Sequence, residues 1–150
     1  MITFSTKKFN ELSTTELYQL LKIRAEVFVV EQNCAYLDVD NYDLGALHIL
    51  GTRNNEIVAY ARLLPQGYYH KEAGIGRVVT SASARTLGYG KLLMEYAITE
   101  TLIQFKTNEI VISAQLYLDK FYTNLGFKTE GKPYLEDDIP HIKMRYLNTI

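Results

Sequence analysis

The stretch that decides the fold is Gly74-Ile-Gly-Arg-Val-Val-Thr80, followed after a short linker by Arg85-Thr-Leu-Gly-Tyr-Gly-Lys91. The first segment is rich in β-branched residues and predicts a strand. The second opens a helix expected over residues 88–105, with its main buried face formed by Leu92, Leu93, Tyr96 and Ala97. Gly88 and Gly90 have no Cβ, so their backbone can turn tightly and bring N–H groups against a ligand. These N–H groups are unpaired donors at the positive end of the helix dipole. The pattern predicts a seat for a phosphate or pyrophosphate, with Arg85 and Lys91 at its rim.

Two common phosphate-binding motifs do not fit this turn. A P-loop needs Gly-x-x-x-x-Gly-Lys-Ser/Thr, but the chain has Arg85 where the first glycine belongs and Leu92 where Ser or Thr belongs. A dinucleotide fingerprint, Gly-x-Gly-x-x-Gly, would need a third glycine where the chain has Leu93. Taken alone, the glycine turn is also what an ordinary helix start looks like.

A second motif, Phe121-Tyr-Thr-Asn-Leu-Gly-Phe127, follows the glycine turn along the chain. Together the two resemble the Gcn5-related N-acetyltransferase (GNAT) family, whose signatures are Arg/Gln-x-x-Gly-x-Gly/Ala and Phe-Tyr-x-x-x-Gly-Phe. The segments Tyr36-Leu-Asp-Val-Asp40, Ala59-Tyr-Ala-Arg-Leu-Leu-Pro65 and Glu136-Asp-Asp-Ile-Pro-His141 are similar to the ElaA-like branch of that family. One departure is Cys34-Ala35, where that branch is expected to have Cys-Pro.

The resemblance implies an α/β (α+β) fold of the GNAT acyl-CoA N-acyltransferase type. That fold has a mixed central sheet, helices on both faces and a splay between the fourth and fifth strands. It also implies one domain over residues 1–150. The residue pattern itself predicts a short helix that carries Tyr122. It further predicts strands over residues 46–52, 57–64, 74–80, 109–114, 128–136 and 141–147.

The capping box Ser13-x-x-Glu16 predicts the start of the first helix. One face then carries, at helical spacing, the residues Leu17, Leu20, Leu21, Arg24, Val27 and Phe28. Arg24 is the charged member of this apolar stripe, and burial of an unpaired charge is very unfavourable. Two interpretations stay open: a structural ion pair with an acidic residue of the following segment, or contact with a substrate.

The resemblance further implies acetyl-CoA as co-substrate. The pyrophosphate would lie on backbone N–H groups of the turn that comprises Leu87, Gly88, Tyr89, Gly90 and Lys91. The backbone of Val78 and Val79 would pair with the pantetheine arm. An acceptor amine would attack the thioester directly in a ternary complex, and Tyr122 would protonate the departing thiolate. The alternative role for Tyr122 is packing beside Phe121 and Phe127.

The acceptor is expected to be a small-molecule or peptide amine. The residues predicted to line its side of the cleft are Arg24, Glu31, Arg62, Arg77 and His141. If Arg62 and Arg77 do so, an acceptor with a carboxylate or phosphate fits; otherwise they are strand charges at the sheet edge. The general base is not identified by the sequence, and the candidates are His48, His141, Glu26, Glu31 and Glu136. A nucleophilic role for Cys34 would require a histidine beside it.

Composition limits the function classes. The chain has 150 residues, of which 47% are hydrophobic, and a net charge of -1, which gives no reason to expect nucleic acid or an anionic membrane as partner. No apolar run approaches the length of a membrane span. A single cysteine cannot form an internal disulfide. We therefore expect a cytoplasmic protein without a metal, and leave open whether it forms a homodimer.

Three rival functions remain. The N-terminal half also resembles acyl-homoserine lactone synthases at Arg24, Phe28, Asp40, Asp43 and Arg62, although the chain has no tryptophan where that family carries one. Such an enzyme would release methylthioadenosine from S-adenosylmethionine. The second rival is a non-catalytic acyl-CoA-binding module, which would not need Tyr122. The third is an interaction protein with a vestigial fold, which would bind no CoA.

Overall fold

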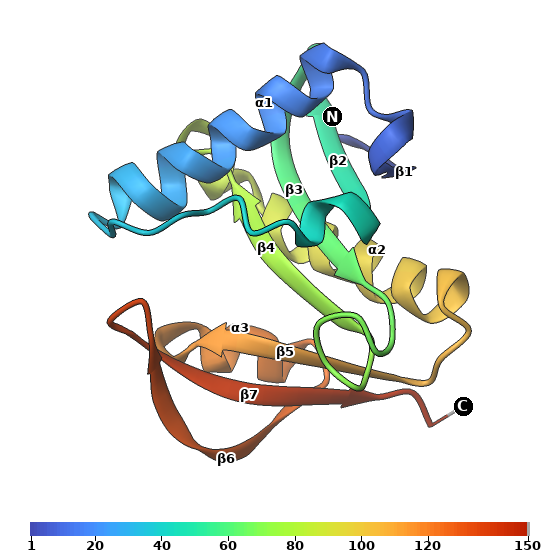
Figure 1. Ribbon diagram of the computed structural model, residues 1–150, viewed down its shortest axis with the longest axis vertical. Helices are drawn as coiled ribbons and strands as arrows, with labels where there is room; N and C mark the ends of the chain where they lie inside the picture. The colour runs from blue at the N-terminus through green and yellow to red at the C-terminus, as the bar shows by residue number, and fades with distance from the viewer. Residues whose placement is uncertain (150) are drawn as a thin grey trace.

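The computed structural model describes residues 1–149, and their seven strands form one mixed sheet in the order β1-β2-β3-β4-β5-β7-β6 (Figure 1). The strands are β1 (Thr3–Lys8), β2 (Leu47–Arg53), β3 (Glu56–Leu64), β4 (Gly74–Thr80), β5 (Glu109–Gln115), β6 (Phe127–Glu136) and β7 (Ile139–Leu147). The β4–β5 pair is parallel, and the other neighbours are antiparallel. The predicted fold class is confirmed.

Helices cover both faces of the sheet (Figure 1). Helix α1 (Thr14–Arg24) continues into the π-helix η2 (Ala25–Glu31) on one face, and α2 (Tyr89–Gln104) and α3 (Asp119–Asn124) pack on the other. Short 3-10 helices are η1 (Phe9–Glu11), η3 (Tyr42–Gly45), η4 (Ala82–Leu87) and η5 (Leu116–Leu118). The predicted capping box is present: the Glu16 N–H donates to Ser13 Oγ at 3.0 Å, and the Ser13 N–H to Glu16 Oε1 at 2.9 Å.

Each face of the sheet has its own apolar core. Residues on the α1 side include Leu20, Ile23 and Tyr60, and the larger core under α2 and α3 includes Leu93, Met94 and Phe127. The expectation that Leu92 lies on the buried face of α2 was wrong, because Leu92 is 45% exposed whereas Met94 is fully buried. The buried residues of α2 form one stripe at helical spacing, Leu93, Met94, Ala97 and Ile98, and Leu92 lies outside this stripe on the solvent side.

Strands β4 and β5 meet at one point and then diverge. Gly74 is opposite Val111, and the Val111 N–H donates to Ala73 O at 2.9 Å. On its other side β4 pairs with β3, but the register is interrupted at Arg77, which has a φ of 49°. The backbone of β4 beyond Gly74 therefore has an edge without a strand partner, and this edge faces the gap between β4 and β5 (Figure 1).

Strand β1 is the element that the sequence pattern does not predict. It contains five polar residues around Phe4 and is half-exposed along most of its length, so it lacks a clear apolar signal. Its pairing with β2, in register from Thr3 opposite Thr52 to Lys8 opposite Leu47, makes it a strand. With β1 counted, the splay lies between the fourth and fifth strands.

The single meeting point of β4 and β5 predicts unequal effects for two glycines on one strand. A Cβ at Gly74 would lie 3.1 Å from Val111 O, whereas a Cβ at Gly76 would meet nothing within 4 Å. We expect Gly74→Ala to lower the free energy of unfolding by about 1–3 kcal/mol because it crowds a backbone atom that cannot easily move. Gly76→Ala is the matched control and should be close to wild type. Urea unfolding measures both, and equal stability of the two variants would contradict the prediction.

Candidate active site

A cleft of about 550 Å³ occupies the space where β4 and β5 diverge. Its β4 wall includes Val78 and Val79, and its β5 wall includes Ile112 and Ser113. The end of η2 and the hairpin between β6 and β7 contribute the remaining sides. The cleft thus lies along the free backbone edge of β4.

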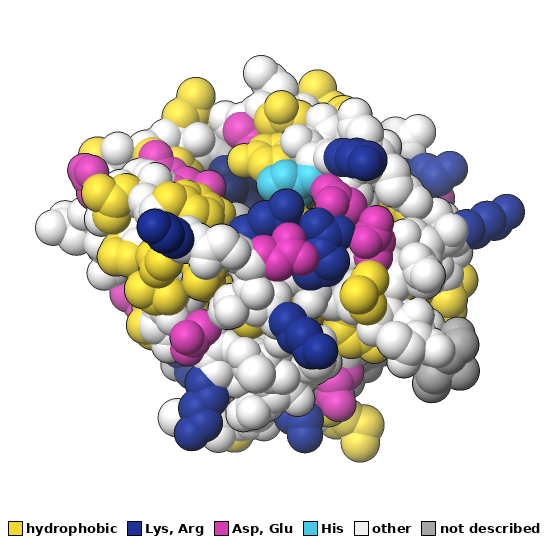
Figure 2. Space-filling view, turned by 90° about the horizontal axis from the view of Figure 1, so that it is seen from below, with side chains coloured by type: hydrophobic (Ala, Val, Ile, Leu, Met, Phe, Trp, Pro, Cys, Tyr) yellow, Lys and Arg dark blue, Asp and Glu magenta, His cyan; other side chains and the backbone are white. Residues whose placement is uncertain are grey.

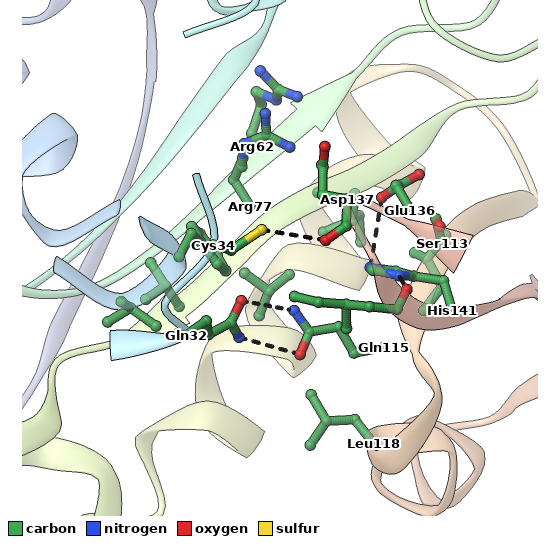
Figure 3. A pocket seen from close by; sticks show the side chains of 18 of the residues that line it. Gln32, Cys34, Arg62, Arg77, Ser113, Gln115, Leu118, Glu136, Asp137 and His141 are labelled. Carbon is green, nitrogen blue, oxygen red and sulfur yellow. Dashed lines mark hydrogen bonds and ion pairs between the residues drawn. The ribbon is translucent and has the colours of Figure 1, made fainter. Parts of the chain in front are cut away.

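The segment at the end of η2, residues 31–34, reaches from one half of the sheet to the other, and we call it the strap. The amides of Gln32 and Gln115 on β5 bond reciprocally at 3.2 and 3.3 Å. Cys34 Sγ donates to Asp137 O at 3.3 Å, at the tip of the β6–β7 hairpin. Figure 3 shows both contacts spanning the cleft. The strap therefore connects the two sheet halves at the end where they are not paired.

Tyr122, the predicted acid, lies on α3 and lines the cleft. Its ring packs edge-on against Phe121 and Phe127, so the packing role is also fulfilled. Burial raises the pKa of its hydroxyl to about 12. Within residues 1–149, Arg62 Nε is the one buried side-chain nitrogen or oxygen without a partner, and nothing there bonds the Tyr122 hydroxyl. That hydroxyl is therefore protonated at neutral pH and accessible from the cleft.

The glycine turn stands beside the cleft at the start of α2. Gly88 is the N-cap residue with a φ of 76°, a left-handed conformation that suits glycine, and no side chain caps the helix. Leu87, Gly88 and Lys91 are exposed, Gly90 is half-buried and Tyr89 is buried. Of the predicted cofactor residues, Val78, Val79 and Arg85 line the cleft. The residues of the turn, Leu87 to Lys91, do not line it, and the turn begins two residues after Arg85 in the chain.

Arg85 has an acidic partner in the strap. Its Nη2 donates to Glu31 Oε2 at 2.8 Å, and its Nη1 donates to Glu31 Oε1. Both side chains are exposed and both line the cleft. The hydrogen bonds from Arg85 are the main cause of the lowered pKa of Glu31. A phosphate that binds at this rim would compete with Glu31 for Arg85.

Arg24 lies outside the cleft in a buried ion cluster. It is completely buried, with Nε 2.8 Å from Asp38 Oδ2 and Nη1 2.7 Å from Asp43 Oδ1. Of the two interpretations that the sequence left open, this is the structural ion pair. Burial alone would raise the pKa of Asp43, but the hydrogen bonds and charges of Arg24 and Arg62 outweigh it and lower that pKa. The cluster ties α1 to the segment that leads into β2.

Arg62 and Arg77 line the cleft, and both also belong to this ion cluster. Arg62 donates to both oxygens of Asp40, at 2.8 and 3.0 Å, and to Asp43 at 3.1 Å. Arg77 Nε donates to Asp38 Oδ1 at 2.7 Å. Three arginines thus face three aspartates, so the cluster is neutral as a whole.

His141 and Glu136 form a pair in the cleft wall opposite the two arginines (Figure 3). His141 is 7% exposed and lies on β7. Its Nδ1 is 2.7 Å from the carbonyl oxygen of Ile139, which can only accept, so Nδ1 carries a proton. In the neutral ring, Nε2 is then the basic nitrogen, and it lies 3.5 Å from Glu136 Oε2.

Of the other candidates for proton transfer or nucleophilic attack, His48 and Glu26 lie outside the cleft and Cys34 lines it. His48 is fully buried between the Tyr60 hydroxyl, at 2.6 Å, and the Asp43 carbonyl, at 2.9 Å, and burial lowers its pKa. Glu26 is exposed and pairs with Lys22 at 3.8 Å. Cys34 lines the cleft, but its sulfur bonds to a carbonyl, and no bond to a histidine exists within residues 1–149.

The family model for the acetyltransferase (GNAT) domain matches residues 16–148 of the chain. The chain belongs to the GNAT acetyltransferase family. A UPF0039 protein of Schizosaccharomyces pombe is 42% identical over 146 residues, which cover 96% of each chain. ElaA of Escherichia coli is 40% identical over 146 residues, covering 96% of this chain and 95% of ElaA.

Solved structures agree with this assignment. An acyl-CoA N-acyltransferase from Pseudomonas aeruginosa is 40% identical, with a TM-score of 0.92 over 97% of this chain and 99% of that one. The E. coli ElaA structure is 39% identical, with a TM-score of 0.90 over the same shares. The ElaA-like resemblance within the GNAT family is confirmed.

Several cleft residues of this GNAT protein were not predicted from the sequence. Ser113 is a polar residue inside the apolar run of β5, and that interruption was a readable signal. Gln32, Gln115 and Asp137 carry no such signal, because only the folded chain brings the strap to β5 and to the hairpin.

Residues 1–149 contain no group of His, Cys, Asp and Glu able to hold a metal. They also contain no helix long and apolar enough to cross a membrane.

The ion cluster predicts a large stability effect at Arg24. We expect Arg24→Met to lower the free energy of unfolding by about 3–5 kcal/mol, because it leaves Asp38 and Asp43 buried without their main partner. Arg145→Met is the control, since Arg145 also contacts several carboxylates but lies at the surface, 19% exposed. Acidic and basic side chains also lie next to one another at the surface, as the face seen from below shows (Figure 2). Urea unfolding of both variants tests this, and a smaller loss at Arg24 than at Arg145 would contradict it.

Proposed function

We propose that this protein is an N-acetyltransferase that moves the acetyl group of acetyl-CoA to an amine acceptor by direct attack in a ternary complex. The observation that supports this most is the free edge of β4 along the cleft: β4 and β5 pair at Gly74 and Val111 and then separate. Backbone N–H and C=O groups seek hydrogen-bond partners. The pantetheine arm, which carries amide groups, is a partner of the right chemistry for Val78 and Val79.

The pyrophosphate of the cofactor would bind at the start of α2. Gly88 adds no side chain there and the first turn of the helix offers uncapped N–H donors from Tyr89, Gly90 and Lys91. Arg85 would release the carboxylate of Glu31 and bind the phosphate instead. Because that ion pair is exposed to solvent, its loss costs little free energy.

Tyr122 would act as the general acid. The acceptor nitrogen forms a bond to the thioester carbon, the carbon–sulfur bond breaks, and the thiolate takes the hydroxyl proton of Tyr122. A backbone N–H of β4 near Val78 would stabilise the charge that develops on the carbonyl oxygen. Burial raises the pKa of Tyr122 to about 12, so the hydroxyl stays protonated at neutral pH but is a weaker acid than a free phenol. Proton transfer therefore depends on the thiolate forming directly beside the hydroxyl.

The acceptor, a small-molecule or peptide amine, would enter the part of the cleft between Arg77 and His141. Arg24 does not belong to this surface, because it is buried. A cytoplasmic location is also part of the proposal and is supported by the single cysteine, Cys34. Release of methylthioadenosine from S-adenosylmethionine would favour the synthase alternative instead.

The phosphate seat is tested at Gly88. Gly88→Asp adds a negative charge beside the expected pyrophosphate, so we expect acetyl-CoA binding to weaken by at least about tenfold, or 1.4 kcal/mol. Gly88→Asn is the control, since Asn and Asp both tolerate the left-handed backbone and differ in charge. Calorimetric titration with acetyl-CoA measures both. Equal affinities for the two variants would show that the ligand lies elsewhere.

The general acid is tested at Tyr122. Tyr122→Phe keeps the ring contacts with Phe121 and Phe127 and removes a hydroxyl that has no protein partner. We expect turnover to fall by about 10²-fold or more, while acetyl-CoA affinity stays close to wild type. Rates of CoA release and calorimetry provide the two readouts. Unchanged turnover would remove Tyr122 from the mechanism. A wild type that binds acetyl-CoA but shows no turnover would favour the binding-module alternative.

A further inference from the structure

The charges in the cleft wall are not balanced. Its arginines are all neutralised by carboxylates: Arg85 by Glu31, and Arg62 and Arg77 by the aspartates of the ion cluster. Glu136 and Asp137 also line the cleft, and within residues 1–149 neither pairs with a lysine or an arginine. The uncompensated charge of the cleft is therefore negative and lies at the end of β6.

Aromatic and basic groups gather at the same place. Tyr69 lines the cleft and is 44% exposed, so part of its ring is available to a ligand. Glu136 lines the same cleft as Tyr69. A carboxylate and an exposed aromatic ring in one cleft suit a cation, through charge attraction and cation–π contact.

His141 supplies a proton acceptor at this end. It is more than nine-tenths buried, it lines the cleft, and its Nε2 lies 3.5 Å from Glu136 Oε2. Its Nδ1–H is held by the Ile139 carbonyl, which fixes Nε2 as the basic nitrogen. Figure 3 shows Glu136 beside the His141 ring, on the opposite side of the cleft from Arg62 and Arg77.

We propose that the acceptor is a cationic alkyl amine, held as an ammonium ion by the carboxylate of Glu136 and the ring of Tyr69 and deprotonated by Nε2 of His141. This inference rests on the proposed acetyl transfer and names its substrate class. It also replaces the sequence-based idea of an acceptor with a carboxylate or phosphate, because the aspartates already occupy Arg62 and Arg77.

The step balances as follows. The ammonium ion gives one proton to His141, and Glu136 stabilises the imidazolium that forms. The neutral amine attacks the thioester carbon, the carbon–sulfur bond breaks, and the thiolate takes the Tyr122 proton. The nitrogen then loses its second proton to the Tyr122 phenolate, and His141 releases its proton to water. The products are the acetamide, CoA with a free thiol, and one proton.

The charge of the acceptor is tested with the wild-type protein. Cadaverine and aminocaproate are linear amines of similar length that differ in the far group, which is a second ammonium in one and a carboxylate in the other. Both carry the reacting ammonium ion, so the comparison tests whether the unpaired carboxylates of the cleft wall attract a second ammonium and repel a carboxylate. We expect kcat/KM for acetylation to be at least about tenfold higher for cadaverine. An equal or higher value for aminocaproate would overturn the proposal.

The role of Glu136 is tested by Glu136→Gln, with Glu130→Gln on the same strand, but outside the cleft, as the control. We expect Glu136→Gln to raise KM for cadaverine about tenfold, and to weaken calorimetric binding of cadaverine to the CoA complex by the same factor. The binding measurement needs no turnover. Unchanged binding in Glu136→Gln would overturn the assignment.

The role of His141 is tested by His141→Asn, whose amide can still donate to the Ile139 carbonyl. We expect kcat for cadaverine to fall by about 10²-fold. Anisidine, an arylamine that is unprotonated at neutral pH, needs no prior deprotonation and should retain its rate. Equal losses for both amines would mean a purely structural role and would overturn the step.

Calorimetry with acetyl-CoA distinguishes a failure of the acceptor assignment from a failure of the acetyltransferase function on which it rests. Absence of acetyl-CoA binding to the wild-type protein would overturn the acetyltransferase function, and the acceptor assignment with it. If acetyl-CoA binds but cadaverine shows no preference over aminocaproate and no dependence on Glu136, only the acceptor assignment fails.

Discussion

Beyond Gly74, the edge of β4 that faces β5 has backbone N–H and C=O groups with no strand partner, and the other features of the molecule are arranged around them. A parallel pair in a sheet normally continues for several residues, and unpaired backbone groups away from water are unfavourable. Here the unpaired edge lines a cleft instead of being buried. A ligand that carries amide groups can complete the sheet, which is why the cleft suits an extended arm such as pantetheine.

Different contacts join the two halves of the sheet at their two ends. At one end Gly74 pairs with Val111, and at the other end the strap contacts β5 through Gln32 and the β6–β7 hairpin through Cys34. The buried cluster around Arg24 fixes the segment that follows the strap against α1 and β3. These contacts fix the walls of the cleft, and the backbone edge of β4 that lines it has no strand partner within residues 1–149.

The same cluster determines the electrostatics of the cleft. Arg62 and Arg77 reach the cleft wall, but the aspartates that hold them also cancel their charge. What remains is the carboxylate of Glu136 beside the His141 ring. The net charge of the cleft wall decides which ligand is attracted, not the charge of one residue. A cleft lined by Arg62 and Arg77 can therefore prefer a cation.

Much of the fold could be predicted from the residue pattern. The capping box at Ser13, the apolar run of β5 and the glycine turn at Gly88 are local features, and the structure has each of them where the sequence indicates it. β1 could not be predicted, because a half-exposed edge strand has little apolar signal and depends on its partner. The exposure of Leu92 depended on which side of α2 faces the sheet, which neighbouring residues do not reveal.

By itself, the sequence determined the family, the order of the main helices and of every strand except β1, and the candidates Tyr122 and Arg85, because these depend on short-range spacing and on motifs. Only the tertiary structure decided which charged residues face the cleft and which are neutralised. Arg24 and Arg77 look alike in the sequence, but one is completely buried and the other lines the cleft. The reason is that burial and charge pairing depend on residues far apart in the chain, such as Glu31 with Arg85, which meet only when the chain folds.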